Sequence, residues 1–329
     1  MSTDLTPFSE LSPEIILSAL DSVGYVCDGH LLALNSYENR VYQIGLENSS
    51  PIIAKFYRPN RWSNAAINEE HQFVQELADN EIPVVPALQF ANNLTLVESH
   101  GFRFSVFPKQ GGRVPEVDSA EKLEWMGRFI GRMHAIGALK PFKSRPTIDI
   151  KNFGQEPSQY ILNSHFLPTD LFNTYSGIIE HALNCVKHCF TRAGNIKQIR
   201  LHGDCYPGNI LWTEDGPHFV DFDDSRMGPA IQDLWMLLSG DRSEMSRQLE
   251  HLLDGYNTFY EFNPRELHLI EALRTLRLIH YSAWIAKRWD DPAFPMAFPW
   301  FNTPRYWQDR IIELREQIAL MEEEPLTIF

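Results

Sequence analysis

The chain has 329 residues, with 29 Lys and Arg against 43 Asp and Glu, which gives a formal net charge of −14. This acidic excess argues against sequence-independent binding of nucleic acid or of an anionic membrane, and it favours a small molecule or another protein as the partner. The length allows two lobes with separate cores. Four cysteines are too few for a disulfide framework, and the sequence shows neither a signal peptide nor a membrane-spanning stretch, so we expect a cytoplasmic protein.

The first part of the chain predicts a small, mostly antiparallel sheet with two helices. Ser12 before Pro13 begins an amphipathic segment that ends at Gly24, which is typical of a short capped helix. Apolar residues at helical spacing predict a second helix over 65–78. Alternation and turn residues predict strands in 31–46, where a polar turn at 35–40 separates two halves, and in 51–59, 82–90, 93–99 and 102–108.

Lys55 lies inside the third predicted strand, where the simpler explanation is an edge-strand lysine that reaches solvent. The next element favours another role, because the helix over 65–78 carries Glu69 and Glu70 in its first half. A lysine on a strand followed by a helix with a glutamate is the arrangement that holds the lysine toward nucleotide phosphates in protein kinases. Such pairs are common, so the pattern gains weight only from motifs further along the chain.

Phe107 and Pro108, followed by KQGGR, predict a hinge near 107–112, because proline fixes φ and a glycine pair permits movement. We therefore expect one lobe over 1–107 and a helical lobe over 108–329. In the second lobe we predict helices over 120–137 (with a glycine cap at Gly137), 170–193, 264–289 and from 304 onward, an irregular connection over 140–165, and a loop over 291–307.

Four side chains in the helix predicted over 170–193 have metal-binding chemistry. His181, Cys185, His188 and Cys189 lie at helical spacing and could form a zinc-binding face. Buried free cysteine on an amphipathic helix is the commoner case, and no second ligand cluster in the sequence supports zinc.

The stretch from 198 to 235 concentrates the polar chemistry of the chain. Asp204 ends an apolar strand and is placed to accept a proton from an attacking hydroxyl. Asn209, five residues later, offers a neutral oxygen to a divalent cation, and Asp221, after a second strand, offers a charged one. Magnesium prefers such hard oxygen ligands.

Other polar residues of this stretch have supporting roles in our interpretation. We expect the His202 ring to turn into the core and brace the loop. Asp233, in an apolar segment, is expected to accept backbone N–H bonds from the loop around Asp204. Asp223 is a secondary candidate for a metal ligand, whereas Asp224 fits a solvated face.

These residues carry a resemblance to a known family. The chain resembles the catalytic stretch of aminoglycoside phosphotransferases, choline kinases and related kinase-like enzymes in four segments, which occur in the order HGDCYPGN, VDFDD, GP and QDLW. The likeness extends over nearly the whole chain and includes the segments LNSYENRVYQ, AKFYRP, EEHQF, GRMH, RPTI and DPAFP. With these segments the chain is similar to the bacterial stress response kinase A family of cytoplasmic serine/threonine protein kinases. The resemblance implies an α+β, bilobal protein kinase-like fold, with a small, mostly antiparallel sheet lobe and a larger helical lobe.

The resemblance also implies a magnesium- and ATP-dependent phosphotransferase of the stress response, with ATP and a protein serine or threonine as its partners. Asp204 is then the proton acceptor, Asn209 and Asp221 are the magnesium ligands, and Asp221 also counts as catalytic. Phosphoryl transfer needs little covalent chemistry from the protein beyond in-line positioning and neutralisation of charge. We expect a monomer.

The nucleotide site follows from the same resemblance. The lobe over 1–107 binds the nucleotide, and the lobe over 108–329 supplies catalysis and substrate binding. Lys55 is the phosphate lysine, Glu70 rather than Glu69 is its helix partner, and Ser36 contacts ATP from the turn that covers the phosphates.

The sequence departs from the kinase pattern at two places. The covering loop NSYENR contains no glycine, so polar side chains or other backbone N–H groups must meet the phosphates. Gly203 stands where many protein kinases have an arginine that binds an activation-loop phosphate, and the run from Asp223 to Pro229 is too short for a long activation segment. We therefore expect activity that is not switched by phosphorylation of such a segment.

Three alternatives stay open. A small-molecule hydroxyl kinase for an amino alcohol, sugar or aminoglycoside uses the same chemistry, and Tyr281, Trp284 and Trp289 could form its aromatic cage for a quaternary ammonium, although most aromatic residues at helical spacing belong to a core. A metal-dependent hydrolase would use His202 with the central aspartates, but a two-metal site needs more histidines at strand ends. A nucleotide-binding scaffold without catalysis would not need the catalytic and metal-binding residues that this sequence retains between 198 and 235.

Overall fold

The computed structural model describes residues 7–117 and 119–328. The chain divides into two compact units: unit 1 comprises Met1–Pro115, Lys143–Arg145 and Gly208–Asp223, and unit 2 comprises Glu116–Phe142, Pro146–Pro207 and Asp224–Phe329. The boundary after residue 107 and the hinge near 107–112 stay predictions.

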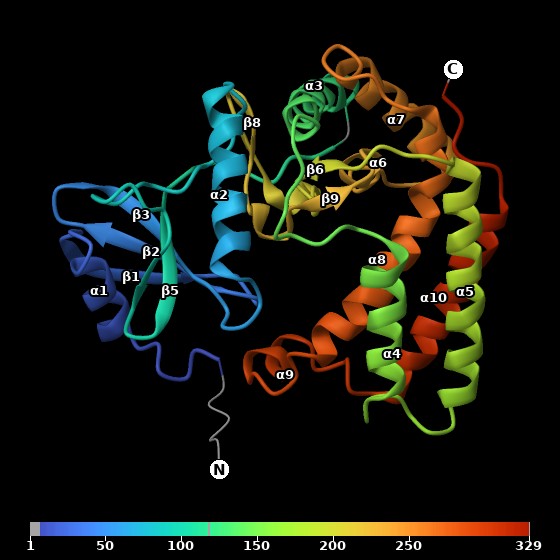
Figure 1. Cartoon of the computed structure of the whole chain (residues 1–329), viewed down its shortest axis with the longest axis horizontal. Helices are drawn as coiled ribbons and strands as arrows, with labels where there is room; N and C mark the ends of the chain where they lie inside the picture. Colours follow the sequence, from blue (N-terminus) through green and yellow to red (C-terminus); the bar gives the residue numbers. More distant parts are fainter. Residues whose placement is uncertain (1–6, 118, 329) are drawn as a thin grey trace. The chain divides into compact units, whose positions relative to one another are not determined.

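Unit 1 is built on a five-stranded antiparallel sheet in the order β1-β2-β3-β5-β4 (Figure 1). Its strands are β1 (Cys27–Leu34), β2 (Arg40–Leu46), β3 (Ser49–Phe56), β4 (Val97–Ser99) and β5 (Phe102–Pro108). The register pairs Lys55 of β3 with Val41 on one side and Ser105 on the other. Lys55 therefore lies on a central strand, which excludes the explanation as an edge-strand lysine.

Two helices pack against this sheet. The predicted N-terminal helix is confirmed as α1 (Pro13–Asp21), whose buried Ile16 and Leu20 join Phe56 in one apolar cluster. The second is α2 (Asn64–Asp79), whose His71 ring contacts Phe107 edge-on. Since neighbouring strand residues point to opposite faces of a sheet, and Ala54 and Phe56 belong to the α1 cluster, Lys55 lies on the opposite face.

The strand predicted over 82–90 is wrong. Pro83 and Pro86 lack the backbone N–H that a sheet ladder needs, and the segment forms only an isolated bridge between Val84 and Phe219. Phe219 ends a separate two-stranded hairpin of unit 1, formed by β7 (Ile210–Thr213) and β8 (Gly216–Phe219). The bridge thus attaches this hairpin to the segment that follows α2.

Unit 2 is mainly helical. Its helices are α3 (Ala120–Gly137), α4 (Glu156–Leu162), α5 (Phe172–Ala193), α6 (Ile231–Trp235), α7 (Arg242–Tyr256), α8 (Ile270–Ala286), α9 (Ala293–Ala297) and α10 (Pro304–Glu322). A two-stranded sheet joins β6 (Ile199–Leu201) to β9 (Arg226–Gly228), and short helical turns are η1 (Lys151–Gln155), η2 (Pro207–Asn209), η3 (Phe222–Asp224) and η4 (Pro264–Leu269). Helices α5, α8 and α10 run side by side around one apolar core (Figure 1).

Two connections predicted without helix contain one. The segment over 140–165 holds η1 and α4, because Pro157 stands in the first turn of α4, where a proline is tolerated. The loop over 291–307 holds α9, with Phe294 and Phe301 fully buried. The helix over 120–137 does end at Gly137, but this glycine is needed for a close approach: a Cβ there would lie 2.2 Å from the Arg200 carbonyl oxygen.

The three aromatic residues considered for a cation cage belong to the core of unit 2. Tyr281 and Trp284 stack on each other at 5.7 Å, and Trp284 also contacts Phe294. Trp289 packs against Phe166 instead. All three side chains are partly buried and pack against this core, as aromatic residues at helical spacing commonly do.

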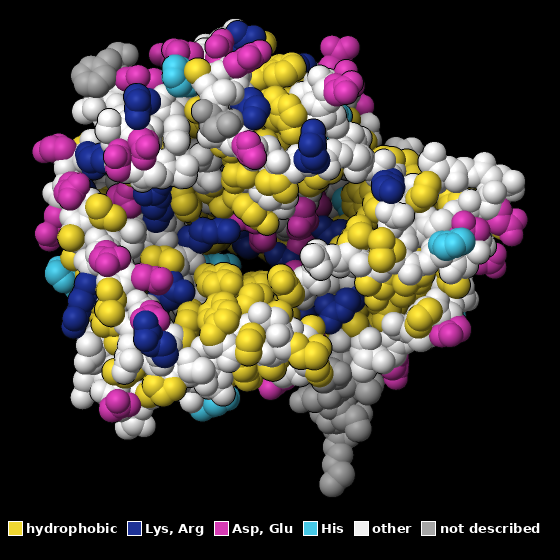
Figure 2. All heavy atoms as spheres, turned by 180° about the vertical axis from the view of Figure 1, so that it is seen from behind, with side chains coloured by type: hydrophobic (Ala, Val, Ile, Leu, Met, Phe, Trp, Pro, Cys, Tyr) yellow, Lys and Arg dark blue, Asp and Glu magenta, His cyan; other side chains and the backbone are white. Residues whose placement is uncertain are grey.

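Figure 2 shows acidic side chains scattered over the visible face, with Lys and Arg side chains between them. The negative net charge is thus spread out on this face and not gathered in one patch. Among the helices that the structure describes, none is both long enough and apolar enough to cross a membrane.

Candidate active site

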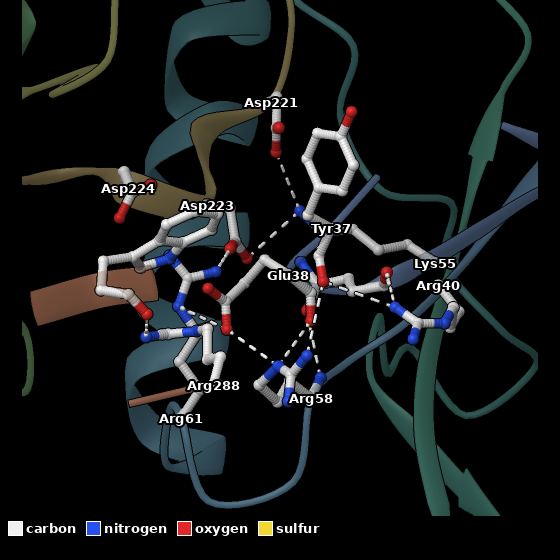
Figure 3. A network of polar contacts seen from close by, with 12 residues as sticks. Tyr37, Glu38, Arg40, Lys55, Arg58, Arg61, Asp221, Asp223, Asp224 and Arg288 are labelled. Atoms are coloured by element: carbon white, nitrogen blue, oxygen red, sulfur yellow. Dashed lines mark hydrogen bonds and ion pairs between the residues drawn. The ribbon is translucent and has the colours of Figure 1, made fainter. Parts of the chain in front are cut away.

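Lys55 is the centre of a buried charge cluster in unit 1. Its side chain is only 9% exposed, and Nζ lies 3.1 Å from Asp221 Oδ1 and 3.2 Å from Asp223 Oδ1 (Figure 3). Burial alone would lower the pKa of the Lys55 ammonium, but the carboxylates of Asp223, Asp221 and Glu70 raise this pKa well above its ordinary value. Lys55 is therefore a permanent cation beside two aspartates.

The hairpin β7–β8 brings Asn209 and Asp221 to one of its ends. Ile210 pairs with Phe219, and the Val220 N–H donates to the Asn209 carbonyl oxygen at 3.0 Å, so the residues flanking the two strands are neighbours. Asp221 has a φ of 60°, in the left-handed region that Asp and Asn tolerate better than other residues. Its side chain is 58% exposed, so one carboxylate at this end of the hairpin is open to a ligand.

Glu70 on α2 is buried and binds Arg145. Arg145 Nη2 donates to Glu70 Oε2 at 2.7 Å, Nη1 donates to the Asp223 carbonyl oxygen at 2.9 Å, and Nε donates to the Ala66 carbonyl oxygen at 2.8 Å. Burial raises the pKa of Glu70 against the opposing charges of Lys55 and Arg145. The negative charge of Glu70 thus helps to raise the pKa of Lys55, whereas the ion pairs of Lys55 are formed with Asp221 and Asp223.

Glu69, the other glutamate considered, has a different function in the fold. Its two carboxylate oxygens accept hydrogen bonds from the backbone N–H groups of Lys143 and Ser144, at 2.9 and 2.8 Å. Glu69 therefore holds the short segment that carries Arg145, whereas the choice of Glu70 as the helix partner of Lys55 stays a prediction.

The glycine-free loop between β1 and β2 is held by arginines (Figure 3). Arg58 Nε lies 3.1 Å from Glu38 Oε1, and the Arg58 backbone N–H donates to Asn39 Oδ1 at 3.0 Å. Arg61 lies between Glu38 and Asp223 and forms ion pairs with both carboxylates. Ser36 lies in the same loop, half-buried, and its hydroxyl forms no hydrogen bond within the described part of the chain.

Unit 2 holds Asp204, directly after β6. Its side chain is 22% exposed, and Arg277 Nη1 on α8 lies 2.7 Å from Oδ1. Burial raises the pKa of Asp204, and the Arg277 guanidinium partly offsets this effect. A carboxylate with a raised pKa is a better proton acceptor than an ordinary aspartate.

Asp233 fixes the backbone that leads to Asp204. It is fully buried, and it accepts hydrogen bonds from the backbone N–H groups of His202 and Gly203, both at 2.8 Å. His134 Nε2 lies 3.1 Å from the same carboxylate. The predicted bracing role of Asp233 is confirmed.

Gly203 has a φ of 87°, and a Cβ there would lie 2.3 Å from the Asp224 carbonyl oxygen. No side chain fits at this position without moving the backbone, so the arginine that many protein kinases carry here is excluded by the local conformation.

A family model described as "Phosphotransferase enzyme family" matches residues 30–270. The chain belongs to this phosphotransferase family. It is 43% identical over 328 residues, 100% of this chain and 99% of the relative, to "Serine/threonine protein kinase RdoA" of Salmonella typhimurium, and 42% identical over the same shares to "Stress response kinase A" of Escherichia coli K12. The recognition of the stress response kinase A family is confirmed.

Solved structures share the fold of this phosphotransferase at low identity. An amicoumacin kinase in complex with AMP-PNP, Ca²⁺ and a ligand named Ami superposes with a TM-score of 0.73 at 18% identity, over 96% of this chain and 95% of the other. A microcompartment-associated aminopropanol kinase gives 0.68 at 14% identity, over 93% and 96%. The predicted α+β, aminoglycoside phosphotransferase-like fold is confirmed.

Sequence reasoning missed three arginines of this phosphotransferase. Arg61 and Arg145 join the charge cluster of unit 1, and Arg277 binds Asp204 in unit 2. Arg277 lies in the predicted helix over 264–289, and helical spacing does not show which distant residue a side chain meets. Arg145 precedes Pro146 in the RPTI segment of an irregular stretch. This position was the only sequence feature that could have marked it as a residue of the site.

We predict that Asp233→Ala lowers the free energy of unfolding by about 3–5 kcal/mol, because two backbone N–H groups and a histidine N–H lose their buried acceptor. Denaturant unfolding measures this loss. Asp254→Ala, at an exposed position of α7, is the matched control and should change the value by less than about 0.5 kcal/mol. A loss below about 1 kcal/mol for Asp233→Ala would contradict the bracing role.

Proposed function

We propose that this chain is an ATP- and magnesium-dependent serine/threonine protein kinase of the bacterial stress response, active in the cytoplasm. The observation that carries the proposal is the end of the β7–β8 hairpin, which brings the backbones of Asn209 and Asp221 together and sets the exposed Asp221 carboxylate beside the buried Lys55 ammonium. The full-length similarity to a protein named as a serine/threonine kinase supports the acceptor class. The four free cysteines fit a reducing compartment.

Our proposal gives each predicted residue one role. In the N-terminal lobe, Lys55 binds the phosphates, Glu70 maintains the field around Lys55, and Ser36 contacts ATP from the covering loop. Asn209 and Asp221 hold magnesium. In the helical lobe, Asp204 accepts the proton of the attacking hydroxyl.

The donor set fits magnesium. Asn209 and Asp221 offer hard oxygens, and the exposure of Asp221 leaves room for waters and phosphate oxygens, which Mg²⁺ retains in its octahedral shell. When bound, the ion would neutralise charge on the transferred phosphoryl group.

A small-molecule kinase is the second candidate. The solved structures with the same fold include proteins named as an amicoumacin kinase and an aminopropanol kinase. Both candidates share the donor chemistry and differ only in the acceptor.

The test is incubation with γ-labelled ATP and Mg²⁺, with a generic acceptor protein and, separately, with a panel of amino alcohols, sugars and aminoglycosides. We expect label on protein serine or threonine, lost with Asp204→Ala. Label confined to a metabolite would replace the proposal by the second candidate, and phosphate release from monoesters without ATP would point to a hydrolase.

We predict that Arg277→Gln moves the acid limb of the kcat profile to higher pH. Arg277 lowers the pKa of Asp204, so its removal raises that pKa, and less of the base is deprotonated at a given acidic pH. Arg274→Gln on the same helix is the control, because Arg274 pairs with Glu271. An unchanged acid limb in Arg277→Gln would mean that Asp204 does not set it.

A further inference from the structure

A second group of side chains with metal-binding chemistry lies in unit 2. His181 and Cys185 lie one turn apart on α5, and Glu322 is the last residue of α10. One ligand atom from each of the three, an imidazole nitrogen, Cys185 Sγ and a carboxylate oxygen, lies within 4.8 Å of both others. The three ligands therefore converge from two helices that are far apart in the sequence.

These three side chains have no competing polar partner. Within the part of the chain that the structure describes, none of them forms a hydrogen bond or an ion pair, and Cys185 is a free cysteine. Cys189, one turn further along α5, differs: its Sγ accepts a hydrogen bond from Arg192 Nη2 at 3.1 Å and lies 3.9 Å from the Met321 carbonyl oxygen. The two cysteines therefore differ in their polar contacts, and this difference favours Cys185 as a ligand. The sequence pattern alone does not distinguish them.

The spacing is close to that of a tetrahedral site. Zinc binds thiolate sulfur at about 2.3 Å and imidazole nitrogen or carboxylate oxygen at about 2.0–2.2 Å, so the ligand atoms of a tetrahedral site lie about 3.3–3.8 Å apart. Since no two of the ligand atoms are more than 4.8 Å apart, closing the group requires them to approach one another by at most about 1.5 Å. His181 and Glu322 are exposed and can rotate, while Cys185 is buried and fixes one corner.

The donor atoms of the group determine which cation it suits. Burial raises the pKa of the Cys185 thiol, and the Glu322 carboxylate raises it further. A bound cation would offset both effects and displace the thiol proton, so that affinity rises with pH. Nitrogen, sulfur and oxygen together suit zinc, whereas magnesium and calcium prefer oxygen ligands alone.

We propose that His181, Cys185 and Glu322 form a binding site for Zn²⁺ or a similar borderline-soft divalent cation. The site is independent of the proposed kinase activity. Three protein ligands leave the fourth position to water, and the bound ion ties the C-terminal end of α10 to the middle of α5. Because the folded chain alone presents the three ligands together, the ion stabilises the fold by mass action.

Titration of the reduced, metal-free full-length protein with Co²⁺ tests the proposal, since cobalt replaces zinc and reports thiolate ligation by its sulfur-to-metal charge-transfer absorption. We expect one equivalent of Co²⁺ to develop this band, Zn²⁺ to remove it, and Zn²⁺ to raise the melting temperature. Cys185→Ser should abolish the band, and His181→Gln, at an exposed position, should weaken Zn²⁺ binding by at least about 10–100-fold.

The helix itself offers matched controls. Cys189→Ser and His188→Gln alter the other two candidates on α5 and should keep the band and the affinity. Absence of the band in the wild type, or a band that survives Cys185→Ser and disappears with Cys189→Ser, would overturn the proposal. Full Zn²⁺ affinity in Glu322→Gln would also contradict the three-ligand site.

Discussion

Replacement of Asp204 by asparagine is expected to lower kcat by about 10²- to 10⁴-fold, with little change in nucleotide affinity. Asparagine keeps the shape and can still accept a hydrogen bond from Arg277, but it cannot take a proton from the attacking hydroxyl. The nucleotide-binding residues of unit 1 are untouched by the change. Steady-state kinetics and calorimetric titration with nucleotide separate the two effects.

Asp254→Asn is the matched control for this variant, since it removes one exposed carboxylate of unit 2 and should leave kcat unchanged. A loss of kcat below about tenfold in Asp204→Asn would contradict the role of Asp204 as proton acceptor. An equal loss of nucleotide affinity would indicate a damaged fold instead.

Replacement of Asp221 by asparagine should remove metal-dependent nucleotide binding and lower kcat/KM about a thousandfold or more, because the charged metal ligand is lost. Asparagine is the suitable substitute, since it tolerates the φ of 60° that alanine would adopt only with strain. Lys55 keeps its ion pair with Asp223, so it retains one of its two ion pairs.

Direct titration with Mn²⁺ gives a readout other than activity. The wild type should bind the metal, and Asp221→Asn should bind it at least about tenfold more weakly. Asp215→Asn, at the opposite end of the β7–β8 hairpin, removes a carboxylate from an exposed turn and should bind normally. Equal Mn²⁺ affinity in Asp221→Asn and the wild type would exclude Asp221 as a metal ligand.

Residues close in sequence were the most predictable part of the site. Asp204, Asn209 and Asp221 occur within one stretch, and the strand that the sequence predicts before Asp221 is present as β8. Asp233 follows the same logic, because a carboxylate in an apolar run needs buried donors and the nearest ones belong to the loop at His202.

Contacts between distant segments were not predictable. Arg145 meets Glu70 across 75 residues of sequence, and Arg277 meets Asp204 across 73. Neither periodicity nor spacing encodes such pairs, because they depend on how whole elements pack. The same limit applies to Glu322, whose approach to His181 and Cys185 has no local signal.

Local errors in the fold have a different origin. The segment over 82–90 has the apolar residues of a strand, but its two prolines prevent a ladder. The connection over 140–165 contains proline and glycine, yet Pro157 begins a helix instead of preventing one. The effect of a proline depends on its place in an element, and sequence alone does not give that place.

The proposed Mg²⁺-dependent protein kinase activity is tested most directly by transfer of label from γ-labelled ATP to a protein acceptor. The transfer is measured for the wild type and for Asp204→Asn, with Mg²⁺ and with excess chelator. We expect label on serine or threonine only for the wild type with Mg²⁺. Equal labelling by Asp204→Asn, or labelling that persists in chelator, would contradict it.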